Sequence, residues 1–275
     1  MRTKQYHWMT IFVLFCVCFL ACKPSVEEII PPNFIIIFAD DLGYGDLSSF
    51  GHPTIHTPNL DQMAHEGMKL TQFYVAASIC TPSRAGLLTG KLPAKIGMAG
   101  ARRVLFPDSY GGLPTTEPTI SSMLNKAGYA TACIGKWHLG HKKEFLPTEH
   151  GFDYYFGIPY SNDMSPPNNN WDYAKAAFPP LPLMEGTEII ELEPDQSQLT
   201  KRYTDKALAF IDKNKNKPFF LYMPQTFPHV PLYVDSLDAG KSKRGLYGDV
   251  VQVLDKSVGA ILDKLKKLNI HENTF

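Results

Sequence analysis

The sequence predicts an α/β protein with a mostly parallel central sheet and helices on both faces of that sheet. Three continuous apolar runs have the character of parallel strands buried on both sides, and they lie at residues 34–39, 129–134 and 218–223. Helical patterns that can cover such strands occur at residues 57–67, 120–127, 203–213 and 245–268. Strands that alternate with helices of this length are typical of parallel α/β sheets.

Capping residues and apolar spacing define the predicted helices. Thr57 is the expected N-cap of the first helix, Pro58 suits its first turn, and Gly67 ends it. Gly128 closes the helix of residues 120–127. The residues expected to face inward have helical spacing, and they are Leu60, Met63 and Ala64, then Ala207, Phe210 and Ile211, and finally Val250, Val253 or Leu254, Val258, Ile261, Leu262 and Leu265.

Weaker patterns occupy the remaining segments. Residues 69–77 predict a strand or an extended segment, and residues 187–192 predict a short hairpin strand. Residues 272–275 predict a turn followed by the first residues of another strand. The Pro- and Asn-rich passage 166–182 is either a surface excursion or a carbohydrate-facing rim, whose aromatic side chains would be Trp171 and Tyr173.

The first 22 residues have the features of an export signal. A basic start precedes an apolar run at residues 9–21, which is short for a membrane span. The run ends at Cys22 in a segment that resembles a bacterial lipobox, so we expect Cys22 to carry lipid and the protein to be exported to the periplasm or the cell surface. An ordinary cleaved signal is the alternative. The expected organisation is a signal peptide over residues 1–22, a tether over 23–32 and one folded domain over 33–275.

Composition and cysteine usage narrow the class of function. The formal net charge is zero, with 27 residues of each sign, so no global field favours nucleic acid as a partner. Cys16 and Cys18 lie in the signal, and Cys133 lies within a buried apolar run, where it is expected to be part of the core. Cys80 therefore remains as the reactive thiol of the folded domain.

Two adjacent carboxylates, Asp40 and Asp41, directly follow the first apolar run. Open α/β sheets bind their ligands beyond the carboxyl ends of the strands. Charges next to a buried strand need a cation or a cationic partner. Because hard carboxylate oxygens suit Ca²⁺ or Mg²⁺, the acid pair is predicted to bind calcium, with magnesium as the alternative.

The string C-T-P-S-R of residues 80–84 places Cys80 at the start of a predicted helix that ends at Gly90. Pro82 suits the first turn, where its missing N–H has no partner to lose. Free backbone N–H groups and the helix dipole favour anions at such a position and lower the pKa of a thiol there. Arg84 is expected to turn back toward Cys80 and offer a fork of donors to an oxyanion.

Basic residues follow the other two predicted strands. Lys136 and His138 come after the run 129–134, and their alternate positions predict that they point to the same side as a clamp for an anion. His229 comes after the run 218–223 and is flanked by prolines, which fix the backbone as a positioned acid or base requires. Four chemically useful groups are therefore expected at one end of the sheet.

These motifs resemble those of the formylglycine-dependent sulfatases, in particular the branch of arylsulfatase A and N-acetylgalactosamine-6-sulfatase. The matching strings are A-D-D-x-G-Y-G-D at 39–46, C-x-P-S-R-x-x-L-x-T-G at 80–90, G-K-W-H-L-G at 135–140 and H-x-P at 229–231. The resemblance extends from residue 34 to residue 275. It implies the alkaline-phosphatase-like fold of that family and the hydrolysis of sulfate esters of aryl groups or carbohydrates.

The resemblance also implies roles for the site residues. A maturation enzyme would oxidise Cys80 to formylglycine, whose aldehyde hydrate presents one hydroxyl to the sulfur. The implied calcium ligands are Asp40, Asp41 and residue 80. The other implied roles are charge stabilisation by Arg84 and Lys136, and protonation of the leaving alcohol by His229 together with a lysine beyond the matched strings. Sulfate release would be helped by His138 or by an acid beyond the matched strings.

Three features of the family lie beyond the matched strings: an Asp-Asn pair that completes the calcium site, a sulfate-binding lysine, and a smaller C-terminal domain. None of them is found in the 275 residues. Ca²⁺ seeks six to eight oxygen ligands. We therefore expect the 275-residue chain by itself to bind calcium poorly and to be essentially inactive.

Two other functions fit parts of the pattern. One is a phosphatase or phosphodiesterase of the same fold, against which the C-x-P-S-R string argues because such enzymes have no use for a formylglycine signal. The other is an inactive glycan-binding lipoprotein. Among the sulfatase readings, scavenging of sulfated glycans fits the predicted tether and the loop of residues 166–182.

Overall fold

The structure is a computed structural model, and it describes residues 30–100, 104–165 and 178–275. The chain divides into two compact units, Met1–Pro31 and Pro32–Phe275, and the second contains all the elements described below. The predicted signal peptide, Cys22, most of the tether and the aromatic residues Trp171 and Tyr173 lie outside the described residues. No helix within the described part has the length and apolar content needed to cross a bilayer.

The described residues form a six-stranded sheet in the order β1-β6-β2-β3-β4-β5. The three pairings among the first four strands are parallel, and the pairings β3–β4 and β4–β5 are antiparallel. The mostly parallel sheet is therefore confirmed. The strands are β1 (Phe34–Phe38), β6 (Phe219–Pro224), β2 (Ala130–Ile134), β3 (Tyr154–Gly157), β4 (Pro182–Glu185) and β5 (Glu188–Leu192).

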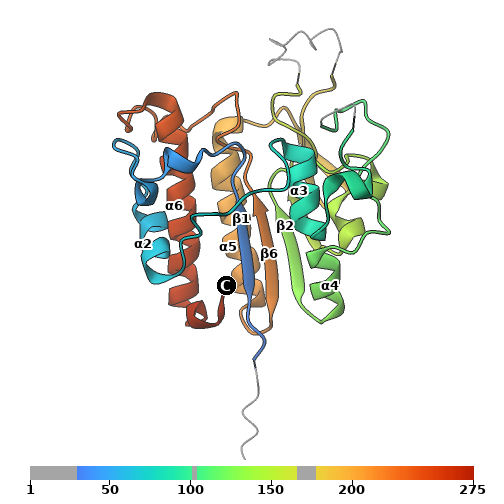
Figure 1. Ribbon diagram of the computed structural model, residues 1–275, viewed down its shortest axis with the longest axis horizontal. Helices are drawn as coiled ribbons and strands as arrows, with labels where there is room; N and C mark the ends of the chain where they lie inside the picture. The colour runs from blue at the N-terminus through green and yellow to red at the C-terminus, as the bar shows by residue number, and fades with distance from the viewer. Residues whose placement is uncertain (1–29, 101–103, 166–177) are drawn as a thin grey trace, which may run out of the picture. The chain divides into compact units, whose positions relative to one another are not determined.

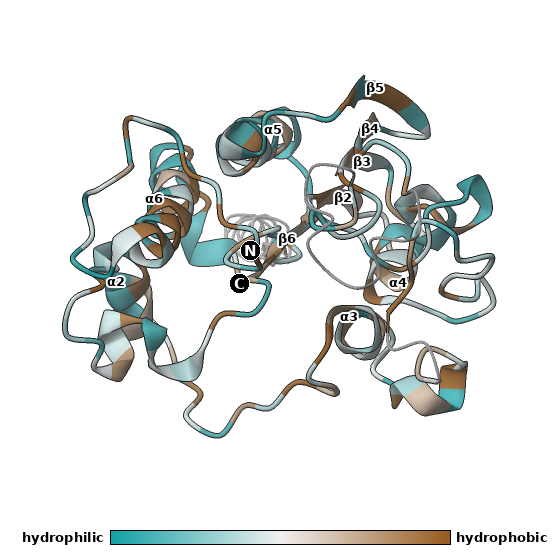
Figure 2. Cartoon of the chain, turned by 90° about the horizontal axis from the view of Figure 1, so that it is seen from above, coloured by the Kyte–Doolittle hydropathy of each residue, from teal (hydrophilic) through white to brown (hydrophobic). Residues whose placement is uncertain are grey.

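Helices cover both faces of this sheet, as predicted (Figures 1 and 2). The core on one face joins α5 (Leu199–Asn214) and α6 (Gly245–Lys267) to alternate residues of β6, namely Phe219, Leu221 and Met223. The opposite face of β6 contributes Phe220 and Tyr222 to a second core beneath α3 (Cys80–Thr89) and α4 (Ile120–Lys126). Strand alternation thus divides one apolar run between two cores.

The inward faces of α5 and α6 agree with the predicted spacing. Ala207 and Ile211 are fully buried, and Val250, Leu254 and Val258 are nearly so. The prediction for α2 (Pro58–Glu66) was wrong at Met63, which is 45% exposed, while Leu60 and Ala64 are partly buried. The physical reason is that α2 packs against α6 at the side of the sheet, so it has a narrower covered face than a helix laid on the sheet.

β1 was predicted to be buried on both faces, but each of its residues is only partly buried. The reason is its position: β1 is the first strand in the order and therefore an edge strand, and the segment of residues 273–275 begins to cover its outer edge. The backbone N–H of Ile35 donates to the carbonyl of Phe275 at 2.7 Å, and Phe275 donates to Asn33 at 2.9 Å. The parallel bridge between Asn33 and Thr274 confirms that residues 272–275 end in the start of another strand.

The short strands β3 and β4 were not predicted, because four residues are too few to establish a period. β5 was predicted with nearly its observed bounds. Residues 69–77 contain turns and no strand. They run in the connection between α2 and α3 (Figure 1), and nearly all of their side chains are exposed, so the segment buries no apolar face against the sheet.

The N-terminus of α2 is capped by a carboxylate from α6. Asp255 is 2% exposed and accepts hydrogen bonds from Asn59 Nδ2 at 2.7 Å and from the backbone N–H of Leu60 at 2.8 Å. Thr57 occupies the predicted N-cap position, but its hydroxyl bonds to Asp61 and Ser48 instead of the helix backbone. Asp255 therefore supplies the cap that Thr57 was expected to supply.

Replacing Asp255 with alanine is expected to lower the free energy of unfolding by about 2 kcal/mol, because it leaves buried donors of α2 unpaired. Chemical denaturation measures this change. Asp263→Ala is the matched control, since Asp263 is exposed on the same helix and its loss should cost at most about 0.5 kcal/mol. Equal stability losses in the two variants would contradict the capping role.

Candidate active site

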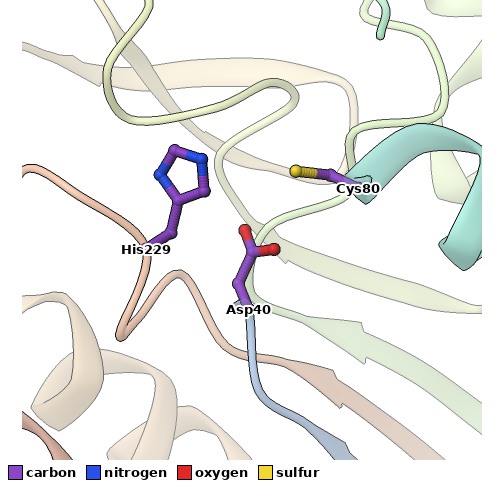
Figure 3. A group of neighbouring side chains, drawn as sticks. All are labelled: Asp40, Cys80 and His229. Atoms are coloured by element: carbon purple, nitrogen blue, oxygen red, sulfur yellow. The ribbon is translucent and has the colours of Figure 1, made fainter. Parts of the chain in front are cut away.

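The predicted site residues converge at the carboxyl ends of the parallel strands. Asp40 follows β1, Lys136 follows β2, His229 follows β6, and Cys80 begins α3. One ligand atom each of Asp40, Cys80 and His229 lies within 4.8 Å of the others. Figure 3 shows these three side chains pointing toward one another from the end of β1, the start of α3 and the loop after β6. The arrangement is the usual location of ligand sites in open α/β sheets.

Asp40 is the centre of a buried charge cluster. Its carboxylate is 5% exposed, and two fully buried cations contact the same oxygen, Oδ2: the ammonium of Lys136 and, at 3.3 Å, Nη2 of Arg84. Burial by itself would raise the pKa of Asp40, but the charges of Lys136 and Arg84 hold that pKa well below its usual range. Asp40 is therefore ionised at neutral pH.

Arg84 is oriented differently from the prediction. We expected it to turn toward Cys80, but Nη1 donates to the backbone carbonyl of Lys136 and Nη2 pairs with Asp40. The guanidinium also lies 5.8 Å from the centre of the Phe38 ring on β1. No hydrogen bond joins it to Cys80 within the described residues. Its direct contacts therefore hold the acid cluster in place, and it acts on residue 80 by charge.

Lys136 connects the acid cluster to Cys80. Its Nζ donates to Asp40, lies 3.8 Å from the Sγ of Cys80, and donates to the hydroxyl of Ser161 at 2.8 Å. Ser161 is 1% exposed and follows β3 at the same edge of the sheet. Ser161 was not predicted from the sequence as a site residue. Its position after a parallel strand could have identified it, but β3 itself was not predicted from the sequence.

The helix start was predicted to lower the pKa of the Cys80 thiol, but that pKa is raised. Burial raises the pKa of the Cys80 thiol, the charges of Lys136 and Arg84 lower it, and Asp40 raises it further. The sequence argument considered only the helix dipole and the free N–H groups, whereas the loss of solvent around the thiol is the larger effect. Unmodified Cys80 is therefore mostly a neutral thiol at pH 7.

His138 was predicted to point to the same side as Lys136 because of strand alternation, and that reasoning was wrong. The segment after β2 is not a strand, and His138 adopts φ of 56°, so strand alternation does not apply there. Its Nε2 is 2.8 Å from the carbonyl oxygen of Leu105, and Nδ1 has no hydrogen-bond partner among the described residues. Burial, followed by the charges of Lys136 and Arg84, holds the pKa of His138 well below its usual value, so its imidazole is neutral.

His229 and Asp41 form the more open side of the site. The His229 side chain is 13% exposed, and its Nε2 lies 3.8 Å from Oδ2 of Asp41, whose side chain is 57% exposed. Asp41 has φ of 64° and faces solvent, unlike its neighbour Asp40. The two adjacent acids therefore have different environments: one belongs to the buried cluster and the other lies at the mouth of the site.

The donor set fits a hard divalent cation. Because both cations contact Oδ2 of Asp40, Oδ1 of that carboxylate and the exposed carboxylate of Asp41 are the oxygens left for a metal ion. Carboxylate oxygens are the preferred ligands of Ca²⁺ and Mg²⁺. The sulfur of Cys80 is a soft donor and suits such an ion poorly.

Comparisons with known proteins agree with this geometry. The sulfatase family model matches residues 32–275. Human N-acetylgalactosamine-6-sulfatase is 40% identical over 260 residues, which cover 89% of this chain and 48% of that protein. Human arylsulfatase A is 42% identical over 269 residues, which cover 93% of this chain and 53% of that protein. The chain spans about half the length of the curated relatives it matches.

Solved structures give the same result. Ps i-CgsB is 36% identical with a TM-score of 0.74, over 89% of this chain and 57% of that chain. The PsFucS1 sulfatase from Pseudoalteromonas sp. is 30% identical with a TM-score of 0.77, over 89% of this chain and 54% of that chain. The phosphonate monoester hydrolase of Agrobacterium radiobacter, 17% identical with a TM-score of 0.61, shares the fold alone. The motifs, the fold and the matched length together establish that the chain belongs to the sulfatase family.

Proposed function

We propose that the protein hydrolyses sulfate esters and that residue 80 acts after oxidation of Cys80 to formylglycine. The observation that carries this proposal is the position of Cys80. In a chain of the sulfatase family, it lies at the start of α3 within 3.8 Å of Lys136 and beside the carboxylate of Asp40. As formylglycine, residue 80 supplies a hydrated aldehyde, one hydroxyl of which attacks sulfur while the other permits release of sulfate.

The side chains around residue 80 carry out the remaining steps of the proposed reaction. Lys136 places a positive charge against the reacting group and stabilises the charge that develops on the sulfate oxygens. Arg84 keeps Asp40 in place. His229 faces the same space and is the proposed donor of a proton to the leaving alcohol oxygen. His138, neutral and with one unpartnered nitrogen, is the proposed acceptor of a proton during sulfate release.

The proposed metal ion is Ca²⁺, with Mg²⁺ as the alternative, held by Asp40, Asp41 and residue 80. The ion would neutralise negative charge on the sulfate. The soft sulfur of Cys80 is a poor ligand for it, whereas hydroxyl groups on a modified residue 80 are hard donors. The chemistry of the donor set therefore supports modification and metal binding as parts of one site.

The proposed substrates are sulfated carbohydrates. Ps i-CgsB, 36% identical to this chain, has been solved in complex with k-i-k-neocarrahexaose. A second relative of known structure, 31% identical, comes from work on the metabolism of glycosaminoglycans in Bacteroides thetaiotaomicron. These neighbours support a carbohydrate as the alcohol part of the ester.

The decisive experiment expresses the full-length protein together with a formylglycine-generating maturation enzyme. It then measures hydrolysis of aryl sulfate, sulfated oligosaccharide and aryl phosphate, with the mass of the peptide that contains residue 80. The proposal expects the mass of formylglycine and a preference for sulfate over phosphate esters. A preference for phosphate would favour the phosphatase alternative. Glycan binding with no turnover by the fully modified protein would favour the glycan-binding alternative.

We also propose that the protein is exported to the periplasm or the cell surface and is anchored to a membrane there by lipid on Cys22. The basic start, the short apolar run and the lipobox-like end of residues 1–22 support this proposal. Cys22→Ser is expected to move the protein from the membrane fraction to the soluble fraction or to block signal processing. Cys18→Ser, four residues earlier, is the control and should leave fractionation unchanged. Identical fractionation of wild type and Cys22→Ser would favour a plain signal peptide.

A further inference from the structure

A row of three polar side chains crosses the sheet beneath α3. Cys133 of β2 is paired in register with Tyr222 of β6 on one side and with Tyr155 of β3 on the other. All three side chains are fully buried and belong to the core that α3 covers. Two tyrosine hydroxyls in an apolar core are costly unless each has a partner. The row therefore calls for a physical explanation.

Arg84 lies on the same side of the sheet and also lacks partners. Its side chain is fully buried, and within the described residues neither Nε nor Nη2 has a hydrogen-bond partner, although Nη2 is 3.3 Å from the Asp40 carboxylate. The hydroxyls of Tyr155 and Tyr222 are likewise unpartnered there. Unpaired donors on the guanidinium and unpaired acceptors on the tyrosines thus occur in one buried layer.

Tyr222 is the tyrosine of the row that lies next to β1, the strand whose Phe38 ring Arg84 covers. Tyr222 pairs with Ile36 on β1, two residues before Phe38, and the Arg84 guanidinium lies over the Phe38 ring. Burial raises the pKa of Tyr222 above its usual value, while the charge of Arg84 and a side-chain interaction with it act in the opposite direction, although no hydrogen bond joins the two groups among the described residues. Tyr155 interacts with Arg84 by charge alone.

We propose that Tyr222 is a positioning residue for Arg84: its hydroxyl accepts a hydrogen bond from one of the two unpartnered guanidinium nitrogens and so keeps Arg84 on Asp40. A small shift of the guanidinium completes this bond. Without it, the polar anchors of Arg84 within the described residues are the Lys136 carbonyl and a carboxylate oxygen shared with Lys136. The catalytic importance of this contact rests on the proposed sulfatase function.

The test compares Tyr222→Phe with Tyr155→Phe in the protein matured at residue 80. Each variant removes one buried, unpartnered hydroxyl from the same row, so both should fold like wild type. Tyr222→Phe is expected to lower kcat for an aryl sulfate roughly 10-fold with KM changed by less than about 2-fold, because a hydrogen bond behind the site orients a reacting group without touching substrate. Tyr155→Phe is expected to keep kcat within about 2-fold of wild type.

A second readout does not depend on turnover. The Nε–H and Nη–H signals of Arg84 are assigned by their loss in Arg84→Lys, and the one bonded to Tyr222 is expected to exchange with solvent roughly 10-fold faster in Tyr222→Phe than in wild type or Tyr155→Phe. Unchanged exchange in Tyr222→Phe, or equal changes in both variants, would overturn the proposal. If the wild type hydrolyses no sulfate ester, the proposed function fails, and the exchange rate by itself then confirms or refutes the pairing of Tyr222 with Arg84.

Discussion

Cys80→Ala is expected to lower kcat for sulfate-ester hydrolysis by roughly 10⁴-fold or more, because it removes the residue that the proposed mechanism converts into the nucleophile. The same change should alter the free energy of unfolding by less than about 1 kcal/mol, since Cys80 is only partly buried and alanine is tolerated at the start of a helix. Steady-state kinetics and chemical denaturation measure the two effects separately.

Cys133→Ala is the matched control, and it should behave in the opposite way. Cys133 is fully buried in β2, so its loss should cost about 1–2 kcal/mol of stability through the cavity it leaves. Activity per folded molecule should stay close to that of wild type. Substantial turnover by Cys80→Ala would show that residue 80 is not the nucleophile, and the proposed function would then need another one.

Asp40→Ala is expected to lower the free energy of unfolding by about 3–5 kcal/mol, because it leaves two fully buried cations, Lys136 and Arg84, without their shared carboxylate. Denaturation in the presence of a metal chelator measures this cost apart from any bound ion. Asp41→Ala is the natural control. The Asp41 side chain is 57% exposed, so its removal should cost less than about 1 kcal/mol.

The same cluster predicts a pH dependence. Since the pKa of Asp40 is lower in the folded protein than in the unfolded chain, its contribution to stability is present above the unfolded pKa of about 3.9 and is lost as the pH falls below that value. Asp40→Ala should therefore flatten the acid limb of the stability curve. Equal losses of stability in Asp40→Ala and Asp41→Ala at neutral pH would contradict the assignment of Asp40 to the buried cluster.

The sequence predicted those parts of the site that depend on local residue patterns. Apolar runs showed where β1, β2 and β6 end, and parallel strands place the residues after their carboxyl ends at one edge. That reasoning was enough to bring Asp40, Lys136 and His229 together, and the turn into α3 added Cys80. These residues could be located because each follows a continuous apolar run or begins a helix, and such patterns are visible in the sequence itself.

The tertiary structure decided what depends on contacts between distant segments. It made β1 an edge strand, revealed the short strand β3 that delivers Ser161, and oriented Arg84 toward Asp40 instead of Cys80. A strand's burial is set by its neighbours, and a thiol's pKa is set by the solvent that packing removes, so neither follows from the residues next to it in sequence. The sequence by itself determined which groups meet at this edge of the sheet, and packing determined which of them are buried, paired and charged.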